Sequence, residues 1–189
     1  MCIIHTLIKI EEGGITLENL SNASASKTRY IVMSSLFAAL IFLVTAYIFH
    51  IPVGGNNGFV HVGDAFIYLA AVLLPMPYAI ITAMIGAGLA DLITGSAIWI
   101  IPTIIIKPIL VLFFTSKGEK IINTRNIIAS VVAGIVGTIL YMIAEGIMIG
   151  SFSSAFVLSL IGLLQPIGSF VVFILIGLAF DKLNIKKYY

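Results

Sequence analysis

Long apolar runs separated by short polar segments fill the chain from Tyr30 onward. A helix needs about 20 mainly apolar residues to cross a hydrocarbon core of about 30 Å, and several runs reach or approach this length. The runs lack the strict two-residue alternation of transmembrane strands. The pattern predicts an all-α integral membrane protein whose six transmembrane helices cover about residues 30–50, 63–75, 77–95, 99–115, 126–149 and 158–180.

Composition supports an integral membrane protein. Of 189 residues, 60% are hydrophobic and only 10% are charged, whereas about a quarter of the residues of a soluble domain are charged. Residues 1–28 are polar and of mixed charge, which indicates a cytoplasmic surface segment and not a secretory signal. Residues 29–189 then form one transmembrane domain.

Basic residues predict the orientation. With six spans, the three loops on the side away from the termini carry no Lys or Arg. Cytoplasmic loops of membrane proteins are enriched in these residues, so the amino and carboxyl termini are expected to be cytoplasmic. All the basic residues except Lys107 fall on the terminal side: Lys9, Lys27, Arg29, Lys117, Lys120, Arg125, Lys182, Lys186 and Lys187.

Polar residues within the spans converge toward the outer half of the membrane. Trp99, Thr103 and Lys107 repeat at every fourth position on the fourth span, which places them on one face. Tyr141 and Glu145 share a face of the fifth span, and Gln165 lies in the outer half of the sixth. Ionisable groups at membrane depth are costly and commonly functional. We therefore expect an outward-facing pocket.

Four ionisable residues of the predicted spans also have structural interpretations. Lys107 and Glu145 either form a buried ion pair or contact a ligand. Asp64 opens the second span, where a carboxylate can cap a helix, and we interpret it as a fixed helix end more than as a contact. Asp91, near the outer end of the third span, either bonds neighbouring backbone or joins the site.

The first outer loop, "GGNNGFVHVGDAF", is rich in glycine and asparagine. Such a backbone changes conformation easily, so Gly55, Asn57 and Phe59 are expected to form a gating lid, with Asn56 and His61 as ligand contacts. His61 has no apparent partners for a metal site beyond Asp64, and the single cysteine offers no thiolate cluster. No metal or other cofactor is expected.

Small residues on the first span offer a surface for close helix packing. In "MSSLFAALIF", Ser34 lies one turn before Ala38, and Ser35 one turn before Ala39. Small residues at this spacing allow another helix to approach closely. The partner is either a helix of another protein or a helix of this same chain.

Four segments from about residue 29 onward resemble the substrate-binding S component of an energy-coupling factor (ECF) vitamin transporter: "SLFAAL", "VHVGDAFIYLAAVLL", "GAGLADLITG" and "PTIIIKPIL". The resemblance implies a non-enzymatic subunit whose uptake is driven by a membrane scaffold subunit and two cytoplasmic ATPases. It also implies that the small-residue face of the first helix, including Ser35 and Ala39, docks on the scaffold. The loop after that helix would cover the substrate.

Among S components, the segments look most like those assigned to hydroxymethylpyrimidine or pyridoxine. Trp99 and Tyr141 suit a heteroaromatic ring, Glu145 can accept from an amino group, and Gln165 can donate and accept. Pantothenate stays open, because Lys107 could bind an anion. A self-sufficient secondary transporter is the main alternative, whereas no Ser/His or paired-Asp arrangement supports an intramembrane enzyme.

Overall fold

The computed structural model of the chain describes residues 17–48, 50–53 and 58–188. Its elements are α2 (Leu17–Tyr47), β1 (Ile51–Val53), β2 (Gly58–Val60), α3 (Asp64–Leu73), α4 (Met76–Ile93), the 3₁₀ turn η1 (Ala97–Trp99), α5 (Ile100–Val111), α6 (Thr124–Ile149), α7 (Phe152–Gly162), α8 (Leu164–Lys182) and the 3₁₀ turn η2 (Ile185–Tyr188). All six predicted spans are helical, which confirms the fold class.

The six passes differ in length. By length and composition, four stretches are long enough to cross a membrane: Ser24–Tyr47, Met76–Ile93, Thr124–Ile149 and Phe152–Lys182. The other two apolar helical stretches, Asp64–Leu73 and Ala97–Val111, are shorter. At 1.5 Å per residue, α3 is only about 15 Å long, half of a hydrocarbon core. The second predicted segment is therefore helical but does not cross a membrane alone.

The short helix α3 forms the centre of the bundle. Nine of its ten residues are buried, and it packs against α2, α4, α5 and α8. A helix that is apolar on all sides belongs inside a protein. The longer helices instead expose Ile, Leu and Val side chains on the outer surface, as lipid-facing helices do.

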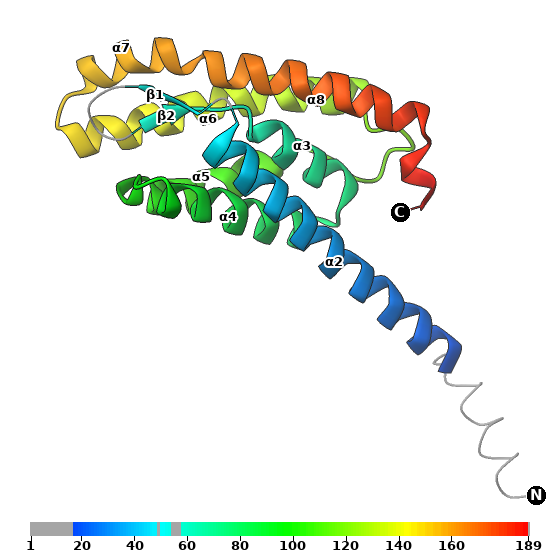
Figure 1. Cartoon of the computed structure of the whole chain (residues 1–189). Coiled ribbons are helices and arrows are strands. Elements are labelled where there is room, and N and C mark those ends of the chain that lie inside the picture. Colours follow the sequence, from blue (N-terminus) through cyan, green and yellow to red (C-terminus); the bar gives the residue numbers. More distant parts are fainter. Residues whose placement is uncertain (1–16, 49, 54–57, 189) are drawn as a thin grey trace, which may run out of the picture.

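The last pass is interrupted where the sequence predicts one helix over about 158–180. Helix α7 ends at Gly162 and α8 begins at Leu164. Proline has no N–H and its ring clashes with the carbonyl four residues earlier, which for Pro166 is that of Gly162. This clash explains the break, and α7 and α8 remain nearly collinear (Figure 1).

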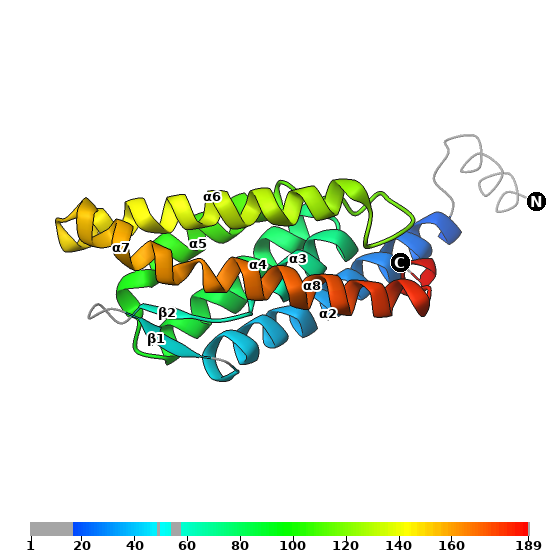
Figure 2. The ribbon, with the colours of Figure 1, turned by 90° about the horizontal axis from the view of Figure 1, so that it is seen from above.

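The loop between α2 and α3 forms a β-hairpin that the sequence did not predict. Strands β1 and β2 pair antiparallel, with Ile51 opposite Val60 and Val53 opposite Gly58. The hairpin lies at the end of the bundle that also carries the connection between α6 and α7 (Figure 2). Beyond it the chain enters α3 at the buried residue Asp64, which is why that helix begins deep and stays short.

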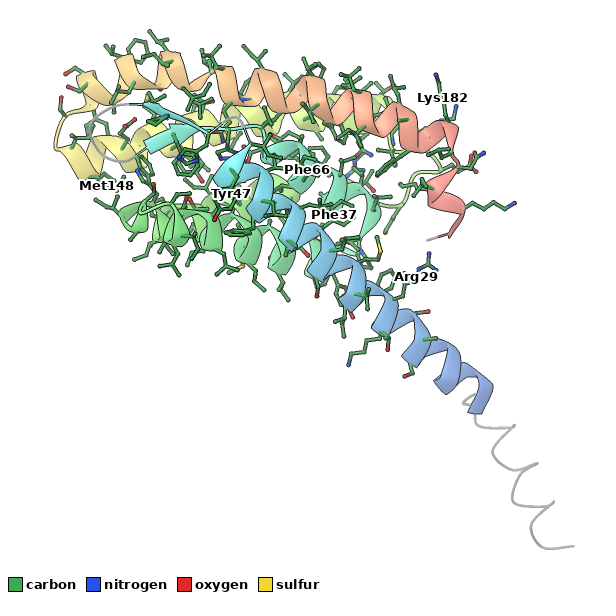
Figure 3. All side chains as sticks on the ribbon, viewed as in Figure 1. Arg29, Phe37, Tyr47, Phe66, Met148 and Lys182 are labelled. Carbon is green, nitrogen blue, oxygen red and sulfur yellow. The ribbon has the colours of Figure 1, made fainter. Side chains whose placement is uncertain are left out.

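The part of α2 around Arg29 and the carboxyl-terminal end of α8 lie at the same end of the molecule. Figure 3 shows Arg29 and Lys182 toward this end, and Met148 and Tyr47 toward the other. Asp181 on α8 holds the α5–α6 loop here by accepting hydrogen bonds from the N–H groups of Ile121 (2.7 Å) and Ile122 (2.9 Å). The shared end agrees with the predicted topology; the assignment of this end to the cytoplasm stays a prediction.

Helices α2 and α4 approach closely at the small residues of α2. The Thr82 hydroxyl of α4 donates to the carbonyl of Ser34 at 3.5 Å, and Gly86 of α4 packs against the backbone of Ala38. Ser34 and Ala38 are accordingly half-buried within this chain, whereas Ser35 and Ala39 are exposed. The predicted docking face therefore narrows to Ser35 and Ala39.

Replacing Gly86 with alanine should destabilise the protein, although alanine normally favours helices over glycine by about 1 kcal/mol. A Cβ at this position would lie 2.8 Å from the carbonyl oxygen of Ala38 and 2.8 Å from the Cβ of Ile41. Overpacking of this kind costs about 1–3 kcal/mol. The thermal melting temperature of purified Gly86→Ala should fall.

Gly162→Ala is the matched control, because a Cβ there meets nothing within 4 Å. Its melting temperature should stay the same or rise. Equal melting temperatures for Gly86→Ala and the native chain would contradict the proposed tight contact between α2 and α4.

Candidate functional site

A cavity of about 950 Å³, including its open mouth, lies among the helices beneath the hairpin. Residues from α2, β2 and each helix from α3 to α8 line it. The cavity contains the predicted site residues that the structure describes: His61, Trp99, Lys107, Tyr141, Glu145 and Gln165, together with Phe59 of the predicted lid.

An ion pair lies at the floor of this cavity. Lys107 Nζ of α5 donates to Asp64 Oδ1 of α3 at 2.6 Å, and Gln165 Nε2 of α8 donates to Asp64 Oδ2 at 2.9 Å. The side chains of Lys107 and Asp64 are only 2% and 6% exposed. Ionised groups at such a depth need a charged partner and hydrogen bonds. One carboxylate thus joins three helices.

This pairing corrects two interpretations from the sequence. Lys107 pairs with Asp64, whereas the sequence analysis considered Glu145 as its partner. The N-cap of α3 is Gly63, and Asp64 is the first residue of the helix. Its carboxylate accepts hydrogen bonds from α5 and α8, and the residue lines the cavity. The spacing of residues along a helix shows which share a face, but it does not show which helix packs opposite that face.

The polar stripes of α5 and α6 meet in the cavity. The hydroxyls of Thr103 and Tyr141 are 3.0 Å apart, and the rings of Trp99 and Tyr141 have centroids 5.9 Å apart. Lys107 Nζ lies 4.9 Å from the centroid of the Tyr141 ring, a cation–π distance. The two aromatic residues therefore form a continuous wall beside the ion pair.

The hairpin closes one side of the cavity through stacked rings. The Phe59 ring stacks on His50 at a centroid distance of 3.9 Å and lies 5.5 Å from His61. His61 is buried, and its Nδ1 accepts a hydrogen bond from the Gly63 N–H at 3.0 Å. The other predicted lid residues, Gly55 and Asn57, and the predicted ligand contact Asn56 lie outside the described residues.

The cavity also contains Thr45 and Tyr68, for which the sequence predicted no ligand contact, and Asp91, for which it left a structural role and a site role open. Thr45 and Tyr68 line it from α2 and α3, and the carboxylate of Asp91 lines it from α4. One signal was available, because Tyr68 follows Asp64 by one helical turn and so shares its face. Thr45 sits in an apolar run and carries no comparable signal.

Comparison with known proteins agrees with this architecture. The family model described as "ECF-type riboflavin transporter, S component" matches residues 25–186. The chain belongs to this family. As an S component it is the substrate-specific membrane subunit of an ECF vitamin transporter, not an enzyme, and it resides in the cell membrane as a multi-pass protein. Searches of curated proteins and of solved structures found no match.

Membership also implies the partners. An S component associates with the ECF scaffold and ATPase subunits and takes up a vitamin ligand. Among the residues that the structure describes, no three His, Cys, Asp or Glu side chains group as a metal site would require. Because the family takes up a vitamin and the cavity is lined by polar and aromatic side chains, the cavity is the candidate vitamin site of this S component.

Removing one member of the ion pair should destabilise the S component more than removing both. Asp64→Asn leaves the ammonium of Lys107 buried without a carboxylate, a change that costs about 3–5 kcal/mol in proteins. The double variant Asp64→Leu/Lys107→Met replaces the pair with apolar side chains and should recover most of the lost stability. Melting temperatures of the purified variants test this, and additive losses in the double variant would contradict it.

Acid should destabilise the protein through His61. Burial lowers the pKa of His61 from 6.5 to about 3. Below pH 6.5 the imidazole is therefore protonated in the unfolded chain but stays neutral in the folded chain. The contribution of neutral His61 is therefore complete above pH 6.5 and is lost as the pH falls, by at most about 1.4 kcal/mol per pH unit.

The melting temperature, measured from pH 7.5 to pH 5, tests this prediction. His61→Asn has no titrating group but keeps an oxygen that can accept the Gly63 N–H. It should lose less stability between the two pH values than the native chain. Parallel curves for the two proteins would show that His61 does not cause the acid sensitivity.

Proposed function

We propose that this S component captures a heteroaromatic vitamin or vitamin precursor that carries no net negative charge. The observation that carries the proposal is the pairing of Lys107 with Asp64. Among the described lining residues, the carboxylates are those of Asp64, Asp91 and Glu145, whereas Lys107 supplies the ammonium. The carboxylates therefore outnumber the cations of the cavity.

This balance of charge argues against an anionic vitamin. Pantothenate would bring a further carboxylate into a cavity that is already acidic, and like charges in a site of low dielectric repel strongly. Its one expected receptor, Lys107, already donates to Asp64 at 2.6 Å. A neutral or cationic ligand with N–H and O–H donors complements the same cavity.

Hydroxymethylpyrimidine is our leading candidate within this class. Its ring can pack on the aromatic wall of Trp99 and Tyr141, whose centroids lie 5.9 Å apart. An aminopyrimidine places an amino group beside a ring nitrogen, and the protonated ring can give a carboxylate two parallel hydrogen bonds. Glu145 is the carboxylate that we assign to this contact, on the same lining as both rings.

Riboflavin is the second candidate, because the description of the matching family names it. A flavin offers a larger flat ring and a chain of hydroxyls, and these hydroxyls are donors that the acidic cavity can also accept. Pyridoxine shares the heteroaromatic ring and uncharged hydroxyls, and belongs to the same class.

The test is calorimetric titration of the purified protein with hydroxymethylpyrimidine, pyridoxine, thiamine, riboflavin and pantothenate. We expect tight binding of one uncharged or cationic heteroaromatic compound and no binding of pantothenate. Glu145→Gln should weaken the binding by at least about tenfold, the effect of losing a charge-assisted hydrogen bond. Unchanged affinity would remove Glu145 from the site, and binding of pantothenate alone would overturn the proposed class.

We also propose that Ser35 and Ala39 dock on the scaffold subunit. Both are exposed on α2, while the neighbouring small residues Ser34 and Ala38 pack within the chain. Ala39→Leu should abolish uptake by cells that contain the ATPase complex and leave vitamin affinity unchanged, because a bulky side chain prevents close helix packing.

Ala179→Leu is the matched control, since Ala179 is exposed on α8. It should leave uptake unchanged. Pull-down of the scaffold by Ala39→Leu at native yield would contradict the docking role. Uptake that persists after deletion of the ATPase genes would favour a self-sufficient transporter instead.

A further inference from the structure

The polar side chains of the cavity differ in how fully they are bonded. On the wall formed by α5, α6 and α8, Lys107 and Gln165 bind Asp64, and the Tyr141 hydroxyl bonds to Thr103. We call the lining residues of α2, α3 and α4 other than Asp64 the second wall. The polar groups of this wall are Thr45, Tyr68 and Asp91.

Three buried polar atoms on the second wall lack hydrogen-bond partners within the described part of the chain. They are Thr45 Oγ1, Tyr68 OH and Asp91 Oδ2. Their residues are only 2%, 1% and 5% exposed. Buried polar atoms without partners are rare in native proteins because each has lost its hydration. All three atoms belong to residues that line the same cavity.

Local packing holds these groups at the cavity. The Tyr68 ring stacks on Phe114 at 4.8 Å and meets Phe173 edge-on at 5.9 Å, so its hydroxyl has a fixed position. A Cβ at Gly63 would overlap Thr45 Oγ1. The glycine therefore leaves the room that this hydroxyl occupies.

Asp91 is fixed in a similar way. Its carboxylate is hydrogen-bonded to the Thr103 side chain, which leaves Oδ2 as the oxygen without a partner. Thr103 in turn contacts the Tyr141 hydroxyl. Asp91 is therefore connected to the aromatic wall, and its second oxygen can accept one more hydrogen bond.

We propose that Thr45, Tyr68 and Asp91 contact the substrate and form a second set of specificity-determining residues. The inference rests on the proposed function and narrows its substrate class. The vitamin must give an N–H or O–H donor to Asp91 and must carry polar groups that the two hydroxyls can bond. A vitamin with one polar edge leaves one of the two walls without partners; one with polar groups on two edges satisfies both.

Substitutions on the second wall should have opposite effects on stability and on vitamin affinity. Tyr68→Phe and Thr45→Val remove hydroxyls that have no partner among the described residues, so they should leave the melting temperature unchanged or raise it. The same substitutions should weaken vitamin binding by about two- to tenfold each. Asp91→Asn keeps the shape but loses the charge, and should weaken binding by more than about tenfold.

Ser169→Ala is the matched control. The Ser169 hydroxyl is buried and lacks a partner in the described structure, but Ser169 does not line the cavity. Its removal should affect stability as Tyr68→Phe does and leave the dissociation constant unchanged. If Tyr68→Phe binds the vitamin more weakly than Ser169→Ala does, the Tyr68 hydroxyl contacts the ligand. The removal of a buried hydroxyl without a partner is common to both variants and cannot cause the difference.

The experiment measures the melting temperature of the full-length purified protein without ligand. It also measures the dissociation constants for hydroxymethylpyrimidine, pyridoxine, thiamine, riboflavin and pantothenate. If Tyr68→Phe, Thr45→Val and Asp91→Asn all bind with native affinity, these residues do not contact the substrate. That result would leave the proposed function intact. A lower ligand-free melting temperature in Tyr68→Phe and Thr45→Val would assign their hydroxyls a structural role instead. Failure of the native protein to bind any of the five would overturn the proposed function and this inference together.

Discussion

The ion pair between Asp64 and Lys107 is the interaction on which the arrangement of the site depends. A carboxylate and an ammonium in the interior of a membrane protein each cost several kcal/mol unless they meet. Their separation of 2.6 Å fixes the position of α3 against α5. The bond from Gln165 to the same carboxylate adds α8. The same carboxylate therefore lines the candidate site and holds three helices of the bundle together.

The length of α3 follows from the same constraint. The hairpin occupies the end of this pass away from the termini, so the chain enters α3 at Asp64, already buried. A helix of ten residues then suffices, because its apolar sides face other helices and not lipid. Four other helical stretches are long and apolar enough to cross the membrane. Burying the shortest helix places an ionisable residue at the cavity floor without exposing it to hydrocarbon.

The sequence predicted much of this structure, and its failures have physical causes. Long apolar runs predicted six helical segments. The separation of Trp99, Thr103 and Lys107 by four residues each placed them on one face of a helix. Spacing could not reveal that Lys107 pairs with Asp64, 43 positions away, because that depends on which helices become neighbours. The hairpin strands have three residues each, too short for alternation to indicate them.

The break before α8 also affects a main-chain group. Pro166 has no N–H to offer the carbonyl of Gly162, and both residues line the cavity. The proline thus removes the helical hydrogen bond that position 166 would otherwise give to this oxygen. Substitution of Gly162 would not remove the oxygen. A scan of side-chain variants therefore tests the side chains of the cavity and leaves its main-chain groups untested.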